Sequence, residues 1–168
     1  MPRKKKQHWD AGSIFLLPLQ DEEFGLGQVI AHEYELLNSA AVAFFDWKEV
    51  WTEHSVVPQP SLDSIISVVH VTVDLLDSGR WRVVSHAAAS PFAHLMPYEQ
   101  LRLKGFVGGK VHGSALAESF LNAFYGLEAW DDWYLPDYLD SFLISPDKKP
   151  FDRLVYSGRY PVPQPSQA

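Results

Sequence analysis

Apolar residues occupy every second position across Val69–Leu75, and polar residues occupy the positions between them. A period of two is typical of a strand that buries one face in an antiparallel sheet. Asp77–Gly79 then predicts a turn, and the apolar run 81–85 predicts a returning strand. This part of the chain is therefore predicted to form a β-hairpin.

The N-terminal third predicts three further strands from short apolar runs. They cover Ser13–Leu19, Phe24–His32 and Ala40–Phe45. The first two runs are separated by the acidic turn 21–23, which favours a second hairpin. Gly25 and Gly27 lie inside the second run and indicate a bulge or a close backbone approach.

Two weaker patterns follow these strands. Pro58 and Pro60 predict a loop over residues 46–61, with one helical turn near 47–51. The run Tyr98–Leu103 predicts another strand that buries Tyr98, Leu101 and Leu103.

The hydrophobic period changes from strand-like to helical after Gly108–Gly109. Ser114 is a candidate N-cap, Gly126 a stop, and the apolar positions at helical spacing are Leu116, Phe120, Ala123 and Phe124. Pro136 begins a second, shorter helix that ends at Pro146, with an apolar stripe of Tyr138, Leu139, Phe142 and Leu143. Strands followed by helices predict an α+β fold: a curled antiparallel sheet or small β-barrel in the N-terminal two-thirds, capped by two C-terminal helices.

The length of 168 residues favours one domain with a single substantial core. We expect a globular domain over residues 9–158. The basic segment 1–8 is predicted to be a flexible tail, and the proline-rich segment 159–168 a second tail.

Charge and composition narrow the class of partner. The formal net charge is −7, and without Arg3–Lys6 the chain holds 10 basic against 21 acidic residues, which leaves about −11. Such a body repels nucleic acid and anionic lipid and attracts a basic protein. The chain has no cysteine, no apolar run of membrane-spanning length and no apolar segment after its basic start, so we expect a cytoplasmic protein.

Motifs for catalysis, metal binding or cofactor binding are weak. The seven histidines have no short metal-ligand spacing, and no Gly-x-Ser-x-Gly elbow is present. Gly105–Lys110 is glycine-rich but lacks the Gly-Lys-Ser/Thr ending of a phosphate loop. We therefore expect no metal and no cofactor.

Aromatic and acidic residues gather between Phe120 and Phe142, which hold eight aromatic side chains. Phe120, Phe124 and Phe142 lie on the helical stripes and are expected in the core. The segment Trp130–Tyr134 lies between the two predicted helices, and we call it with its flanking acids the corner. It has two interpretations: its rings pack in the interior, or its rings and acids bind a basic partner. The candidate binding residues are Glu128, Trp130, Asp131, Asp132, Trp133, Tyr134, Asp137 and Asp140.

Four carboxylates of this segment allow a different hypothesis. Asp131, Asp132, Asp137 and Asp140 could serve a small hydrolase if one of them were held protonated in a dry cleft. The acids equally suit the first turns of helices, where they favour the helix dipole. An enzyme is therefore the third reading, after a protein that binds one dedicated partner and a general protein- or peptide-binding adaptor.

Short motifs occur in a characteristic order between Trp9 and Lys149. They are Gly12–Leu19, Phe24–Val29, Ala43–Asp46, Gly79–Val84, Tyr125–Trp133 and Leu135–Asp140 followed by Leu143. Their order and spacing resemble the immunity-26 family of bacterial polymorphic-toxin systems. Ser13 stands where the family pattern has Asp, and Glu22–Glu23 replaces a glycine-containing turn.

This resemblance implies a cytoplasmic protein that binds a cognate toxin and blocks it, with no cofactor and no turnover. The toxins of such a family are chemically diverse, so the resemblance does not name the target. The acidic composition adds that a basic toxin, such as a nuclease, would be steered towards the chain.

Overall fold

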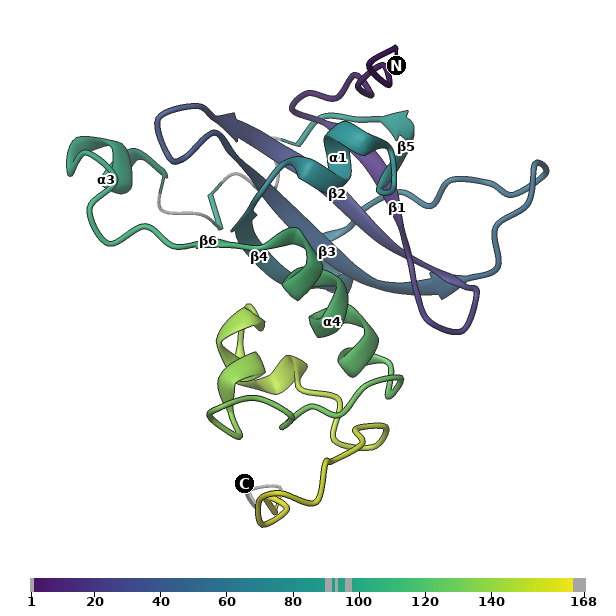
Figure 1. Cartoon of the computed structure of the whole chain (residues 1–168), viewed down its shortest axis with the longest axis vertical. Helices are drawn as coiled ribbons and strands as arrows, with labels where there is room; N and C mark the ends of the chain where they lie inside the picture. The colour runs from purple at the N-terminus through teal and green to yellow at the C-terminus, as the bar shows by residue number, and fades with distance from the viewer. Residues whose placement is uncertain (1, 90–91, 93, 96–97, 165–168) are drawn as a thin grey trace.

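Six strands form one open, mixed sheet in the computed structural model (Figure 1), which describes residues 2–89, 92, 94–95 and 98–164. The strands are β1 (Ser13–Pro18), β2 (Phe24–Glu33), β3 (Ser39–Glu49), β4 (Ile65–Val71), β5 (Arg82–His86) and β6 (Val111–His112). Their order is β5-β1-β2-β3-β4-β6, and the pairs are antiparallel except for the parallel pair β4–β6. The α+β prediction is confirmed, with an open sheet in place of a barrel.

The first three predicted strands are confirmed as β1, β2 and β3. However, β3 continues to Glu49, so the helical turn predicted near 47–51 is wrong. Lys48 and Glu49 pair with the start of β2, and Lys48 forms ion pairs with Asp21 and Glu23 in the β1–β2 turn. The charged turn therefore holds the end of β3 in the sheet.

The predicted hairpin between 69–75 and 81–85 is wrong. β4 ends at Val71, the chain then forms the short helix α1 (Asp74–Ser78), and β5 pairs with β1 at the opposite edge of the sheet. Beyond the strand, the Thr72 hydroxyl donates to Oδ1 of Asp74 (2.6 Å), the first residue of α1. The apolar residues after Val71 belong to a helical turn. Over so few residues, an alternating pattern does not distinguish such a turn from a strand.

The strand predicted over Tyr98–Leu103 is a helix, α3, with the same bounds. Local hydrogen bonds close it, including Phe106 N to Leu101 O (2.6 Å). Leu103 is 88% exposed rather than buried, and Leu101 is half-buried. The predicted burial of Tyr98 concerns a side chain outside the described part.

Both C-terminal helices are present. α4 (Ser114–Phe124) begins one residue after its N-cap, Gly113, and Gly126 ends it with φ of +74°. A Cβ at Gly126 would lie 2.5 Å from the carbonyl oxygen of Arg153, so this close approach requires glycine. The second helix is the 3-10 helix η2 (Tyr138–Phe142), followed by η3 (Pro146–Lys148).

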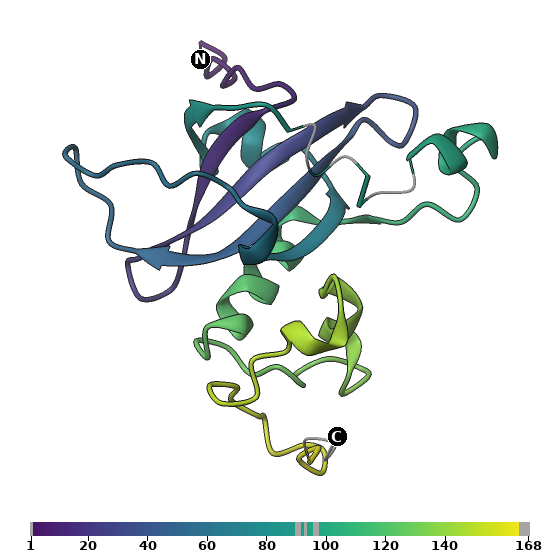
Figure 2. The same ribbon diagram turned by 180° about the vertical axis from the view of Figure 1, so that it is seen from behind.

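Each face of the sheet has its own apolar cluster. α1, α4 and the C-terminal segment cover one face, which contains Phe15, Phe44 and Trp81. Segments from the 47–57 and 84–95 regions pack on the other face. Figures 1 and 2 show α4 lying across the sheet, with the C-terminal segment beyond it on the side away from the sheet.

The two glycines of β2 make room for the first cluster, as the sequence predicted. A Cβ at Gly27 would lie 2.3 Å from Phe15 Cζ, and one at Gly25 would lie 2.4 Å from Leu121 Cδ2 of α4. Gly27 allows the Phe15 ring to lie across the strand, and Gly25 lets α4 approach the sheet. Close backbone approach is the reason for both residues.

Gln7 fastens the N-terminal segment to α1 and β5. Its amide Nε2 donates to the carbonyl oxygens of Leu76 (2.8 Å) and Trp81 (2.9 Å), and its Oε1 accepts from Val83 N (3.0 Å). Lys6, the preceding residue of the segment predicted to be a flexible tail, forms an ion pair with Asp77.

Gln7→Ala is expected to destabilise the fold by about 1–3 kcal/mol, because partly buried backbone groups lose their partners. Urea denaturation monitored by tryptophan fluorescence measures this change. Lys5→Ala, which alters an exposed neighbour, is the matched control and should leave the midpoint unchanged. Equal midpoints for Gln7→Ala and wild type would show that these contacts contribute nothing.

Candidate functional site

The candidate binding residues divide into interior and surface groups. Trp130 and Asp131 are buried, with 0% and 1% of their surface exposed. Trp130 Nε1 donates to Asp140 Oδ1 (2.7 Å), and its ring lies 5.8 Å from that of Phe120. Asp131 Oδ1 accepts from Ser157 N (2.6 Å). These two residues hold the corner together and do not face solvent.

Trp130→Ala is expected to destabilise the protein by about 3–5 kcal/mol, because it removes a large buried ring and leaves a cavity. The loss should appear as a lower urea midpoint with little change in slope. Trp133→Ala removes a half-buried ring of the same corner and should lower the free energy of unfolding by much less. A cost for Trp130→Ala no greater than that for Trp133→Ala would contradict its place in the core.

The remaining members of the corner lie at or near the surface. Tyr134 is 74% exposed, and its ring lies 5.4 Å from that of Tyr138. Asp132 is exposed and paired with Arg159 (3.0 Å), and Asp137 is exposed. Trp133 is half-buried, with its ring 5.5 Å from Tyr138.

Three of the four carboxylates considered for hydrolysis are engaged by different groups, and the fourth, Asp137, is exposed. Asp131 is in the interior, Asp132 pairs with Arg159, and Asp140 pairs with Lys149 (2.9 Å) as well as with Trp130. In the described part of the chain, no group of three or more His, Asp or Glu side chains is placed to hold a metal ion. The aspartates therefore do not converge on one cleft.

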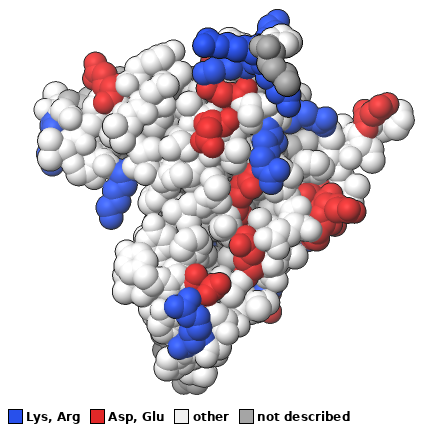
Figure 3. All heavy atoms as spheres, viewed as in Figure 1, with Lys and Arg blue, Asp and Glu red and all other residues white. Residues whose placement is uncertain are grey.

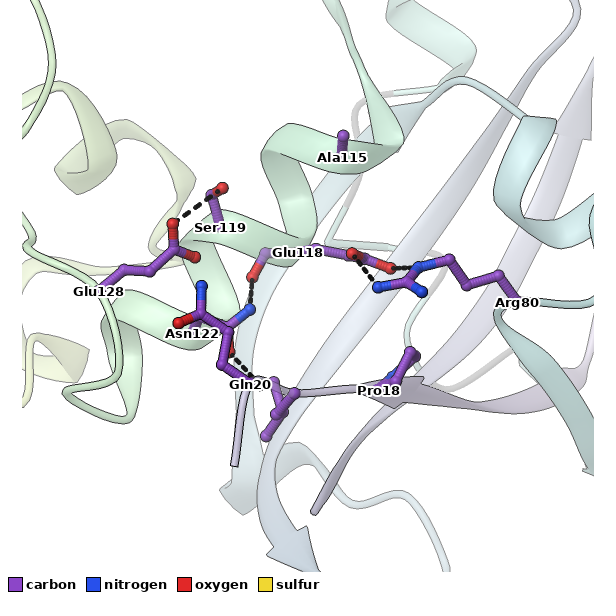
Figure 4. A pocket seen from close by; sticks show the side chains of 9 residues that line it. Pro18, Gln20, Arg80, Ala115, Glu118, Ser119, Asn122 and Glu128 are labelled. Carbon is purple, nitrogen blue, oxygen red and sulfur yellow. Dashed lines mark hydrogen bonds and ion pairs between the residues drawn. The ribbon is translucent and has the colours of Figure 1, made fainter. Parts of the chain in front are cut away.

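Two neighbouring hollows lie beside α4. One has a volume of about 300 Å³ and is drawn in Figure 4; the other, of about 240 Å³, shares Ser119 and Glu128 with it. We call them together the Glu128 groove. Its lining residues are Pro18, Leu19, Gln20, Arg80, Ala115, Glu118, Ser119, Asn122, Glu128, Ala129, Asp132 and Trp133.

A hydrogen-bonded network forms one wall of the Glu128 groove (Figure 4). Arg80 donates twice to the carboxylate of Glu118, with Nε–Oε1 at 2.8 Å and Nη2–Oε2 at 3.1 Å. The buried Trp81 donates from Nε1 to Glu118 Oε1 (3.0 Å). Asn122 accepts from Gln20 N (2.9 Å) and donates to the Glu118 carbonyl oxygen (2.9 Å). The charge of Glu118 is therefore fixed in place and compensated.

Glu128 differs from its neighbours because no described cation pairs with it. Its printed partner is the hydroxyl of Ser119, at 3.4 Å. Partial burial raises the pKa of Glu128 above its usual range; the Ser119 hydrogen bond opposes this rise, and the charges of Glu118 and Asp132 add to it. The groove thus contains a carboxylate that is paired with no cation among the described side chains and lies close to two others.

Sequence reasoning identified part of this groove. Glu128, Asp132 and Trp133 were candidates and line it, but Arg80 and Glu118 were missed as site residues. The available signal was the polar side of α4, opposite its apolar stripe. Figure 3 shows acidic side chains gathered along the middle of this face of the molecule, with few basic groups between them.

No helix in the described part of the chain is both long and apolar enough to cross a bilayer. Searches of the curated proteins and of the solved structures gave no match. A family model described as immunity protein 26 matches residues 10–104, from the start of the sheet to the end of α3. This match spans more than half of the chain and agrees with the resemblance of the strand motifs. The chain belongs to the immunity protein 26 family.

Proposed function

We propose that this immunity protein acts in the cytoplasm, where it binds a cognate bacterial toxin stoichiometrically and neutralises it at the Glu128 groove and the adjoining Tyr134 rim. The single observation that carries the placement is Glu128, a partly buried carboxylate without a described cation in a groove that holds two more acids. A lysine or arginine of the partner would supply the missing counter-charge.

The shape of this surface supports the same placement. Tyr134, the residue after the groove-lining Trp133, presents an exposed ring, and aromatic side chains contribute much of the energy at protein interfaces. The acids would favour a basic partner and speed its approach. A basic nuclease fits these requirements, because its phosphate-binding groups would meet carboxylates.

The direct test is co-expression with the toxin encoded by the neighbouring gene. Protected cells and a recovered one-to-one complex are the expected result. Cells that die although both proteins accumulate, with no complex recovered, would overturn the immunity proposal. Recovery of several unrelated proteins in its place would favour a general adaptor.

Glu128→Gln separates binding from folding. Since the pKa of Glu128 is raised in the folded state, its ionised form is less favourable there than in the unfolded chain. At neutral pH the glutamine variant of the free protein should therefore melt slightly higher than wild type. The difference should vanish as pH falls through the raised pKa, where the wild-type carboxyl is protonated too.

The same substitution that stabilises the free protein should weaken its affinity for the toxin. We expect Glu128→Gln to weaken the complex at neutral pH by about tenfold, because a charged contact loses one partner. Wild-type affinity should fall towards that of the variant as the pH is lowered through the Glu128 titration. The matched control, Glu53→Gln, alters an exposed acid outside the groove and should change neither property. Equal affinity of Glu128→Gln and wild type at neutral pH would remove Glu128 from the interface.

A further inference from the structure

A second exposed surface lies at the end of the molecule formed by the β2–β3 turn and by α3 with the loop after it. Four large apolar side chains are exposed there: Tyr34 (74%), Leu37 (83%), Leu103 (88%) and Val107 (77%). Figures 1 and 2 both show the two segments close together, and a Cβ at Gly109 would lie 3.2 Å from Leu36 Cδ1. We call these four residues the apolar tip. Exposed apolar side chains gathered at one end of a protein mark a candidate interaction surface.

The turn that presents Leu37 is strained but well bonded. Leu37 and Asn38 have φ of +53° and +51°, a region that is unfavourable for leucine. Three backbone hydrogen bonds hold the turn: Leu36 N to Glu33 O, Asn38 N to Tyr34 O and Ser39 N to Leu36 O. Leu36 points inward, and Leu37 points outward at an energetic cost. Positive φ at both central positions is what this tight hairpin turn requires, and Asn, Asp or Gly usually occupies them, so Leu37 is an unfavourable residue there both for its backbone and for its exposure.

Tyr34 is also held in place before any partner arrives. Its ring stacks on His32, with centroids 3.9 Å apart and planes at 25°, and His32 lies 4.4 Å from the Trp9 ring. His32 Nε2 is hydrogen-bonded to Asn38 Oδ1 (2.6 Å) across the same turn. A side chain that is already ordered loses little entropy when it is buried at an interface.

Charge identifies the partner that fits this surface. The chain carries a formal net charge of −7, so two copies repel each other wherever acids dominate. Beside the apolar tip both signs are present, with exposed Glu35 and exposed Lys104 and Lys110. Figure 3 shows separate red and blue groups around a largely uncharged surface over this end. A two-fold axis through the tip would place acid of one copy against base of the other.

We propose that the apolar tip is the interface of a symmetric homodimer. No residue of the tip lines the Glu128 groove, and a dimer that binds toxin at both grooves would keep the equal numbers of the two proteins expected above. This inference does not depend on where the toxin binds, since self-association is measured without it.

Sedimentation equilibrium of the full chain tests the proposal. The apparent mass should rise with concentration from that of one 19.0 kDa chain towards twice that value. Leu37→Asn should raise the dimer dissociation constant by about tenfold or more, because it removes a buried leucine from the interface. Asparagine tolerates positive φ, so this variant should fold at least as well as wild type. Val56→Asn, at another 87% exposed apolar residue, is the control and should dimerise normally.

Charge reversal gives an independent measurement. Glu35→Lys and Lys104→Glu should each weaken the dimer, and the double variant should regain affinity if the two residues meet across the axis. A mass that stays at one chain at every soluble concentration overturns the proposal. So does a dimer that Leu37→Asn leaves intact. If Leu37→Asn instead abolishes toxin capture without affecting self-association, the apolar tip is a toxin contact and the dimer proposal is wrong.

Discussion

Replacing Glu128 with lysine is expected to weaken the toxin complex by a factor of about 100 or more and to abolish protection in cells, because burying a like-charged pair costs several kcal/mol. The substitution puts a cation where a basic partner is proposed to supply one. In the free protein the same change is mild, since the new amine lies near Glu118 and Asp132. Fluorescence titration with the purified toxin and a plating assay measure the two effects.

Two companion variants sharpen this test. Asp132→Lys changes an exposed carboxylate that already pairs with Arg159, so its effect should be smaller and mainly on the association rate at low salt. Asp131→Lys should unfold the corner rather than report on binding, since Asp131 is buried. A Glu128→Lys protein that folds, binds and protects as well as wild type would exclude the groove as the toxin contact.

Removing the Trp81 side chain should lower the free energy of unfolding as much as removing that of Trp130. Its ring stacks on Phe15 at 5.0 Å, meets Phe44 edge-on at 5.8 Å and is fully buried. We expect Trp81→Ala to cost about 3–5 kcal/mol, a large part of the roughly 5–15 kcal/mol by which folded domains are stable. The urea midpoint should fall sharply, and the variant should accumulate poorly in cells.

Trp81→Phe separates the ring from its hydrogen bond to Glu118. It keeps most of the buried area but loses the indole Nε1 donor, at an expected cost of about 1–2 kcal/mol. If toxin affinity falls as well, the network behind the groove positions the Glu118 carboxylate for binding. A Trp81→Ala protein as stable as wild type would contradict the placement of this ring at the centre of the first apolar cluster.

Local patterns predicted the elements whose structure depends on local preferences. β1, β2 and β3 follow from short apolar runs and turns, and α4 follows from its stripe and from Gly126. The position of β5 was not predictable in this way, because its partner β1 lies far away in sequence and α1 carries the chain across the sheet. α3 was missed because the spacing of its apolar residues fits neither a strand nor a helix clearly.

The groove also combines features that the local sequence indicates with features that only the fold reveals. The acids near Trp130 stood out in the sequence, but nothing local distinguishes the buried Trp130 from the half-buried Trp133. The contact between Arg80 and Glu118 joins two distant parts of the chain, so only the fold reveals it. The absence of a described cation near Glu128 likewise depends on which side chains the fold brings together.

The division between interior and surface along residues 128–134 bears on how this protein can acquire a new specificity. Trp130 and Asp131 are fixed by packing and hydrogen bonds, whereas Asp132 and Tyr134 lie at the surface and Glu128 is partly buried in the groove. Mutations at the surface positions can accumulate with little cost to folding. On the proposed placement of the toxin, a lineage that meets a changed toxin would retarget this corner by single substitutions, while the buried neighbours keep its backbone constant.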